Sequence, residues 1–314
     1  MTENAMKLQR WHGAEFPHVV HGTGSLPEHL VATGKDTDEQ LSTSGAILFR
    51  GFDVTDPEAF DAAVRAYGAP GFTYAESLSN AVRVNVTDRV FTANEAPPET
   101  SIYLHHEMAQ TPLYPSKLFF FCEIAADQGG ATPLCRSDIL LERLRESDGA
   151  FVERLESQGV RYTNIMPASD DAGSGQGRSW RSTLGAASRE EAEARLAKLD
   201  YAWEWQDDDS LRATTPVLDA VRQLPDGRTV FFNQLIAAFR GWSDSRNDPS
   251  RAISFGDGEP ITLADMAEAI RLSDELTFDM PWQSGDVVLV DNFLVMHGRR
   301  PFSGKRRVLA SLIS

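Results

Sequence analysis

The hydrophobic pattern along the chain predicts mostly β-strands. Short apolar or alternating runs, typical of strands, occupy residues 46–49, 117–124, 229–232, 286–290 and 307–312. Loops, not regular helices, separate most of these runs. This spacing favours an antiparallel β architecture over a doubly wound α/β sheet.

Helix signals are grouped in two regions of the chain. Asp56 and Pro57 are typical of a helix start, and Ser137 begins a second helical stretch that continues with the Ala/Glu/Arg-rich residues 188–199. Residues 168–177 are small, polar and glycine-rich, and we expect a mobile loop or lid there. The pattern predicts one domain over residues 1–314, with an N-terminal lobe at 1–71 and a helical insertion at about 137–225.

Composition narrows the choice of partners and compartment. The chain carries 30 Lys+Arg against 46 Asp+Glu, a net charge of −16, which disfavours nucleic acid and anionic membrane surfaces. Its 2 cysteines are too few for a disulfide scaffold. The first residues lack a signal-peptide pattern, and no apolar run approaches the roughly twenty residues that a membrane span needs. We therefore expect a cytoplasmic protein.

A candidate metal site begins at His105 and Glu107. In an extended segment, side chains two positions apart point to the same face, so these two can converge on one cation while His106 points away. Among the remaining histidines, His297 directly follows a strongly apolar run. Two imidazoles and one carboxylate leave three positions open on an octahedral ion, which suits Fe(II) oxygenases. The same ligands also fit a zinc hydrolase.

Two further segments suggest an anion site. One arginine of Lys305-Arg306-Arg307 can point into the same cavity as the metal, and Arg307 shares a strand face with Leu309 and Ser311. A guanidinium inside a barrel needs a planar anionic partner such as a carboxylate. Thr132, after a Gly-Gly turn, has a hydroxyl that can donate to that carboxylate.

Taken together, the motifs resemble the taurine dioxygenase / clavaminate synthase superfamily of Fe(II)/2-oxoglutarate-dependent oxygenases. Within it, the chain looks most like the syringomycin-type amino acid hydroxylases. The matching segments are, in order, 46–52 (AILFRGF), 104–108 (LHHEM), 129–133 (GGATP), 230–234 (VFFNQ) and 291–302 (DNFLVMHGRRPF).

The resemblance implies a mainly β fold with flanking helices, the double-stranded β-helix or jelly roll. It assigns Fe(II) to His105, Glu107 and His297, and the distal carboxylate of 2-oxoglutarate to Thr132 and Arg307. Asn233 would lie near the substrate side of the pocket. Ser311 stands where taurine dioxygenase has its sulfonate-binding arginine, which argues against a sulfonate substrate.

The resemblance also implies the reaction. Fe(II), 2-oxoglutarate and O₂ would serve to hydroxylate an unactivated C–H bond of an amino acid or a derivative, free or tethered to a carrier protein, in a natural-product pathway. Glu107 favours hydroxylation or desaturation over halogenation, because halogenating relatives have a small residue at that position. The alternatives are a desaturase or cyclase of the same family and, in other classes, a zinc hydrolase or a non-catalytic metal-binding barrel.

Overall fold

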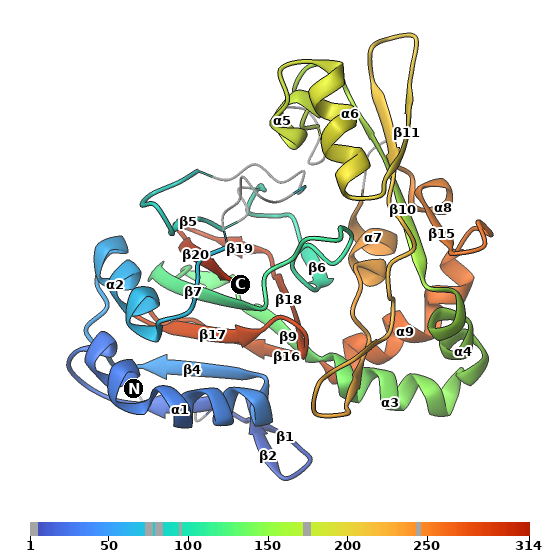
Figure 1. The fold of residues 1–314 in the computed structure, drawn as a ribbon. Coiled ribbons are helices and arrows are strands. Elements are labelled where there is room, and N and C mark those ends of the chain that lie inside the picture. Colours follow the sequence, from blue (N-terminus) through green and yellow to red (C-terminus); the bar gives the residue numbers. More distant parts are fainter. Residues whose placement is uncertain (1–5, 73–77, 79–83, 94–95, 172–176, 243–245) are drawn as a thin grey trace.

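Two sheets form the centre of the molecule. The computed structural model describes residues 6–72, 78, 84–93, 96–171, 177–242 and 246–314. Within these residues the larger sheet runs in the order β3 (His18–His21), β4 (Ala46–Arg50), β17 (Val287–Asp291), β7 (Lys117–Ile124), β20 (Arg307–Ile313) and β5 (Phe91–Thr92). The smaller sheet runs in the order β16 (Phe278–Met280), β9 (Thr132–Arg136), β18 (Val295–Arg299) and β6 (Ile102–His105). Among these strands, all pairs are antiparallel except the parallel pair of β3 and β4 in the larger sheet. The predicted double-stranded β-helix is confirmed (Figure 1).

Strand β7 illustrates how the sequence builds the two faces of the large sheet. Leu118 and Phe120 point into the core between the sheets, whereas Phe119 and Phe121 point to the opposite face. Because both faces are covered, the strand is apolar along nearly its whole length and does not alternate with polar residues.

Helices α1 (Leu26–Ser44) and α2 (Pro57–Tyr67) cover the outer face of the large sheet (Figure 1). The Asp56 side chain caps α2 by accepting from Ala59 N, as the Asp-Pro signal predicts. The predicted N-terminal lobe is built into the core fold, because its strands β3 and β4 extend the large sheet.

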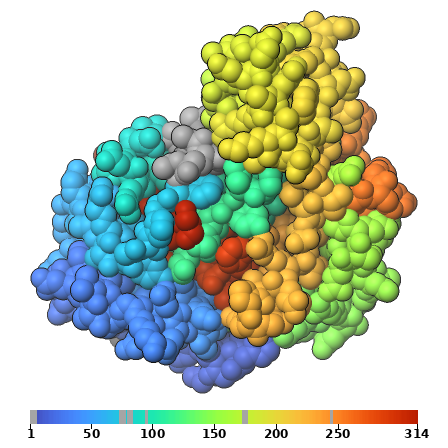
Figure 2. Space-filling view, in the orientation of Figure 1, coloured from blue at the N-terminus to red at the C-terminus, as the bar shows by residue number. Residues whose placement is uncertain are grey.

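The segment between β9 and β16 covers the other side of the small sheet. Its helices α3 (Ser137–Ser147), α4 (Gly149–Gln158), α7 (Leu235–Gly241) and α9 (Leu263–Leu276) share one apolar core. The remaining elements are α5 (Trp180–Leu184), α6 (Arg189–Lys198), α8 (Pro249–Ala252) and the sheet of β11 (Ala202–Trp205), β12 (Leu211–Thr214), β10 (Val160–Met166) and β15 (Ile253–Phe255). Helices continue beyond the expected end of the insertion at about 225, and the last of them, α9, packs on α3. In Figure 2 the yellow part with α5 and α6 projects above the sheets.

Three short strand pairs complete the described fold. They are β1 (Gln9–Trp11) with β2 (Ala14–Phe16), β13 (Arg222–Gln223) with β14 (Thr229–Val230), and β8 (Gln128–Gly129) with β19 (Phe302–Ser303). The last pair holds the Gly-Gly turn against the chain that leaves β18. Among the described residues, no helix combines the length and the apolar character that a membrane crossing requires.

Candidate active site

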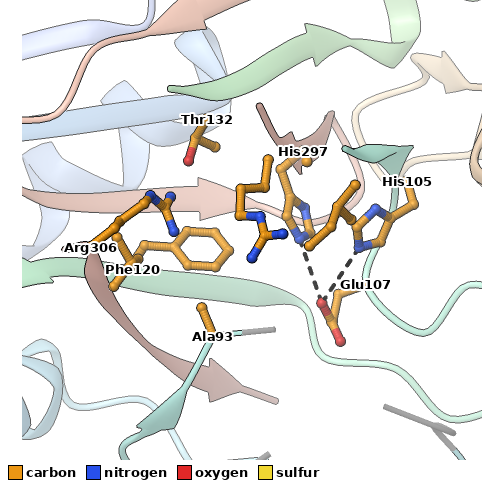
Figure 3. A pocket seen from close by; sticks show the side chains of 11 residues that line it. Ala93, His105, Glu107, Phe120, Thr132, His297 and Arg306 are labelled. Carbon is orange, nitrogen blue, oxygen red and sulfur yellow. Dashed lines mark ion pairs between the residues drawn. The ribbon is translucent and has the colours of Figure 1, made fainter. Parts of the chain in front are cut away.

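The three predicted metal ligands meet at one point. His105 ends β6 and is the direct strand partner of His297 in β18, and Glu107 follows in the turn after β6. Oε2 of Glu107 lies 3.5 Å from Nε2 of His297 and 3.9 Å from Nε2 of His105. One donor atom from each residue lies within 4.8 Å of the other two (Figure 3). Two imidazole nitrogens and one carboxylate oxygen, placed to occupy one face of an ion's coordination sphere, are the donor set of non-haem Fe(II) oxygenases.

The two neighbouring histidines have opposite environments, as the strand geometry predicts. Nδ1 of His105 lies 2.8 Å from the carbonyl oxygen of Tyr103, which can only accept, so the proton is on Nδ1 and the lone pair of Nε2 can bind a metal. His106 points away into the protein, where its ring contacts the carbonyl oxygens of Asn292 and Phe231. Burial lowers the pKa of His106 to about 3.

A buried asparagine holds the backbone of the carboxylate ligand. Oδ1 of Asn292 accepts from Glu107 N at 2.8 Å, and its Nδ2 donates to Glu107 O at 3.1 Å and to Pro115 O at 2.8 Å. Gln234 Nε2 donates to the carbonyl oxygen of His106 at 3.0 Å. These contacts hold a turn that places Met108 at a φ of 60°, a conformation that costs energy for a residue with a side chain. Asn292 lies inside a motif segment quoted above, but its role is not visible in the pattern.

A cavity of about 500 Å³, including its mouth, opens beside the triad. Arg306 and Thr132 line one end, the triad lines the other, and Phe120 lies between them (Figure 3). The rest of the lining includes the apolar residues Ala93, Ile102 and Val308. Partial burial, with a smaller effect of the Arg299 guanidinium, lowers the pKa of Arg306 to about 10, so Arg306 is still charged at neutral pH.

The glycine pair before Thr132 makes room for Arg306. Gly130 has a φ of 68°, and a Cβ there would lie 3.0 Å from Cδ and 3.1 Å from Nε of Arg306. Its carbonyl oxygen accepts from Arg306 Nε at 3.1 Å. In the described part of the chain, neither terminal nitrogen of Arg306 has a hydrogen-bond partner in the protein. The fork of the guanidinium is therefore available to a ligand.

The prediction that Arg307 faces the cavity is wrong. Its side chain is 43% exposed and pairs with Glu123 on the surface, at 2.5 Å. Arg307, Leu309 and Ser311 do share a strand face, but that face points toward α1 and α2, where Leu309 lies in the apolar cluster under the helices. Residues 306 and 308 face the cavity instead.

Arg299 also lines the cavity, but its guanidinium is already used. Nη1 donates to Ala96 O at 2.8 Å, and Nη2 donates to Pro97 O at 2.6 Å and to Thr100 O at 2.9 Å. It ties β18 to the segment that leads into β6. Sequence reasoning missed this residue, although it follows His297 closely in a quoted motif.

Comparison with known proteins decides the family. The family model described as taurine catabolism dioxygenase TauD, TfdA family matches residues 7–312. The chain belongs to the TauD/TfdA family. It is 42% identical to a clavaminate synthase-like protein of Arabidopsis thaliana over 276 residues, 88% of this chain and 83% of that protein. It is 32% identical to the dapdiamide synthesis protein DdaC of Enterobacter agglomerans over 315 residues, 95% of this chain and 91% of that protein.

Solved structures agree on the fold. A putative α-ketoglutarate-dependent 2,4-D dioxygenase of Burkholderia xenovorans has a TM-score of 0.54 at 15% identity, covering 99% of this chain and 97% of that one. AAD-2, solved with Mn(II) and N-oxalylglycine, has a TM-score of 0.51 at 15% identity, covering 95% and 94%. With the triad, family membership makes this protein an Fe(II)/2-oxoglutarate-dependent dioxygenase. The zinc hydrolase and the non-catalytic barrel are thereby excluded.

Two residues predicted on the substrate side of this TauD-family site lie elsewhere. Asn233 is buried, but Nδ2 donates to Ala220 O and Oδ1 accepts from Leu235 N, both at 3.0 Å, so its amide supports the start of α7. It does not line the cavity. Ser311 is buried on the helix-covered face of β20, opposite the cavity-facing Val308. Both predictions are corrected for the same reason: the side chains point away from the metal.

One other sequence hypothesis falls partly outside the described residues. Residues 172–176 of the expected lid are not among them, so its mobility stays a prediction.

Proposed function

We propose that this dioxygenase hydroxylates an unactivated C–H bond of an amino acid or an amino acid-derived molecule in a natural-product pathway, as the syringomycin-type hydroxylases do. The observation that carries the proposal is the complete triad, with Glu107 in place, beside a cavity with apolar walls. Apolar walls hold the unreactive part of a small substrate and keep water away from the oxidation.

In this proposal Arg306 and Thr132 bind the distal carboxylate of 2-oxoglutarate. The free fork of Arg306 and the buried Thr132 hydroxyl both lie at the end of the cavity away from the triad. A guanidinium fork matches a carboxylate in two parallel hydrogen bonds. Binding the distal carboxylate of 2-oxoglutarate there orients its other, chelating end toward the metal. The same role was expected of Arg307.

The chemistry divides between the metal and the chain. Bound Fe(II) supplies the activation of O₂ that couples decarboxylation of 2-oxoglutarate to oxidation of a C–H bond. The residues hold and orient: the triad holds the ion, Arg306 and Thr132 orient the cosubstrate, and the wall around Phe120 excludes water. With a carboxylate at position 107, no ligand position is freed for a halide, which supports hydroxylation over halogenation.

The substrate class is supported by a relative and by a missing charge. DdaC is named for dapdiamide synthesis, which supports a natural-product pathway. The position four residues after Arg306 is Ala310, so it lacks the cation that would bind a sulfonate there. With Arg306 in place of Arg307 as the 2-oxoglutarate residue, the expectation is the same: the substrate is not taurine.

The test is a substrate screen with Fe(II), 2-oxoglutarate and O₂. Free amino acids, carrier-protein thioesters of the same amino acids, and taurine would be compared by succinate release and by product mass. We expect one amino acid or its thioester to stimulate succinate release and to gain one oxygen atom, and taurine to do neither. Loss of two hydrogens would instead identify a desaturase or cyclase. Stimulation by taurine alone would overturn the proposed substrate class.

A further inference from the structure

Thr132 receives a hydrogen bond from a residue far away in the chain. Nε1 of Trp282 donates to Oγ1 of Thr132 at 2.9 Å, across 150 residues. Indole nitrogen can only donate, so Thr132 accepts. A hydroxyl has one proton and two lone pairs, and the indole occupies one lone pair. The remaining proton must then point away from Trp282, and it stays available to a ligand in the cavity that Thr132 lines.

The segment that carries Trp282 is itself fixed by Arg50. Nε and Nη2 of Arg50 bind the two carboxylate oxygens of Asp286 at 2.9 and 2.6 Å, and Nη2 also donates to Pro281 O at 3.0 Å. Asp286 is buried, and its carboxylate accepts from Gln283 N at 2.7 Å. These bonds hold the chain on both sides of Trp282.

The contacts of Arg50 suggest a role for the segment 46–52, which does not contribute to the metal site. Arg50 ends β4 within this segment, one of those that resemble the family, yet it lies outside the cavity lining. Its contacts lead from β4 through Asp286 and Pro281 to Trp282, and from Trp282 to Thr132. Arg50, Thr132 and the segment 281–286 lie far apart in the sequence, and only the fold brings these three places together.

We infer that Trp282 is a positioning residue for 2-oxoglutarate: its indole directs the Thr132 hydroxyl toward the distal carboxylate, and Arg50 holds Trp282 in place. This inference rests on the proposed binding of 2-oxoglutarate by Arg306 and Thr132. Trp282 itself does not line the cavity, so it acts through Thr132 alone.

The main experiment measures 2-oxoglutarate affinity without turnover. The Fe(II) protein is titrated anaerobically with 2-oxoglutarate while the metal-to-ligand charge-transfer band is followed. Loss of one hydrogen bond should weaken binding about three- to tenfold in Trp282→Phe. Thr132→Val should weaken it at least as much, and the double variant should bind no more weakly than Thr132→Val. Full additivity of the two effects would overturn the inference.

A second ligand separates positioning from general structural damage. 2-Oxopentanoate keeps the chelating end of 2-oxoglutarate but lacks the distal carboxylate. Trp282→Phe should therefore leave its affinity unchanged, while weakening 2-oxoglutarate. Equal weakening of both ligands would mean that Trp282 only supports the fold.

Matched variants complete the design. Trp180 is also buried and donates its indole N–H to Asp209 O at 3.1 Å, but it does not line the cavity, so Trp180→Phe should not change 2-oxoglutarate affinity. Arg50→Lys should weaken 2-oxoglutarate in the wild-type background and add nothing in Trp282→Phe. An equal effect in both backgrounds would remove Arg50 from the inference.

Arg306→Ala distinguishes this inference from the function it rests on. Unchanged 2-oxoglutarate affinity in Arg306→Ala would overturn the proposed cosubstrate site itself. Weakened binding in Arg306→Ala together with unchanged binding in Trp282→Phe would overturn only the role of Trp282.

Discussion

Asn292 binds both backbone polar groups of Glu107, although 185 residues separate the two in the chain. Asn292 lies in the turn between β17 and β18, and β18 carries His297. The same turn therefore positions two of the three metal ligands: one through its strand, the other through an amide. The carboxylate of Glu107 can keep a defined direction even though its backbone is no longer in a strand.

Replacing Asn292 should weaken metal binding. Asn292→Ala removes three buried hydrogen bonds, so we expect Fe(II) affinity to fall about ten- to a hundredfold and the free energy of unfolding to fall by about 1–3 kcal/mol. Anaerobic calorimetric titration with Fe(II) and thermal unfolding measure the two effects. Asn233→Ala is the matched control, since Asn233 is also buried and bonded to backbone but away from the metal. Equal loss of Fe(II) affinity in both variants would contradict a specific role.

Glu107 should be indispensable for turnover. Glu107→Ala removes the only carboxylate of the triad, and we expect succinate release and product formation to be abolished. Glu123→Ala serves as the control, because Glu123 forms a surface ion pair with Arg307. Activity of Glu107→Ala near that of the wild type would remove this residue from the metal.

The two adjacent arginines should differ sharply in their effect on 2-oxoglutarate. Arg306→Ala should raise the apparent KM for 2-oxoglutarate by about ten- to a hundredfold, because it removes a charged hydrogen-bond partner from the cavity. Arg307→Ala should leave that KM unchanged, since its side chain faces solvent. Steady-state succinate assays at varied 2-oxoglutarate give both values. The reverse order of effects would restore Arg307 to the site.

Both cysteine thiols should be inert in the folded protein. Burial raises the pKa of Cys122 to about 12, and burial likewise raises the pKa of Cys135. Because the thiolate is the reactive form, a pKa near 12 leaves roughly one thiolate in ten thousand at about pH 8. Iodoacetamide should therefore label neither residue until denaturant is added, as intact mass would report.

The same pKa shifts set the sign of a stability change. Raised pKa values in the folded state mean that ionisation of these thiols favours the unfolded chain, so their contribution to stability is lost as pH rises above 9.0, the ordinary thiol value. Thermal unfolding should shift to lower temperature above that pH. A variant with Cys122→Ala and Cys135→Ala should lose less of its own stability over the same pH range.

The sequence by itself determined the helices and strands whose formation depends mainly on residues close by in the chain. Strand β7 runs over the same residues, Lys117–Ile124, that the apolar pattern predicts. The Asp-Pro start of α2 is confirmed, and so is the helix predicted at 188–199, where Ser188 caps α6. The spacing of His105 and Glu107 predicted a shared target on the assumption of an extended segment; the two side chains do meet, although β6 ends at His105 and Glu107 lies in the following turn.

Only the tertiary structure decided which residues face the cavity. Alternation along β20 shows which side chains share a face, but both faces are apolar, because one packs between the sheets and the other under α1 and α2. Such a strand has no polar side from which its direction could be inferred, so Arg306 and Arg307 were indistinguishable in the pattern. The contacts of Asn292 and Trp282 were hidden for a related reason: each joins segments that only the packing of the two sheets brings together.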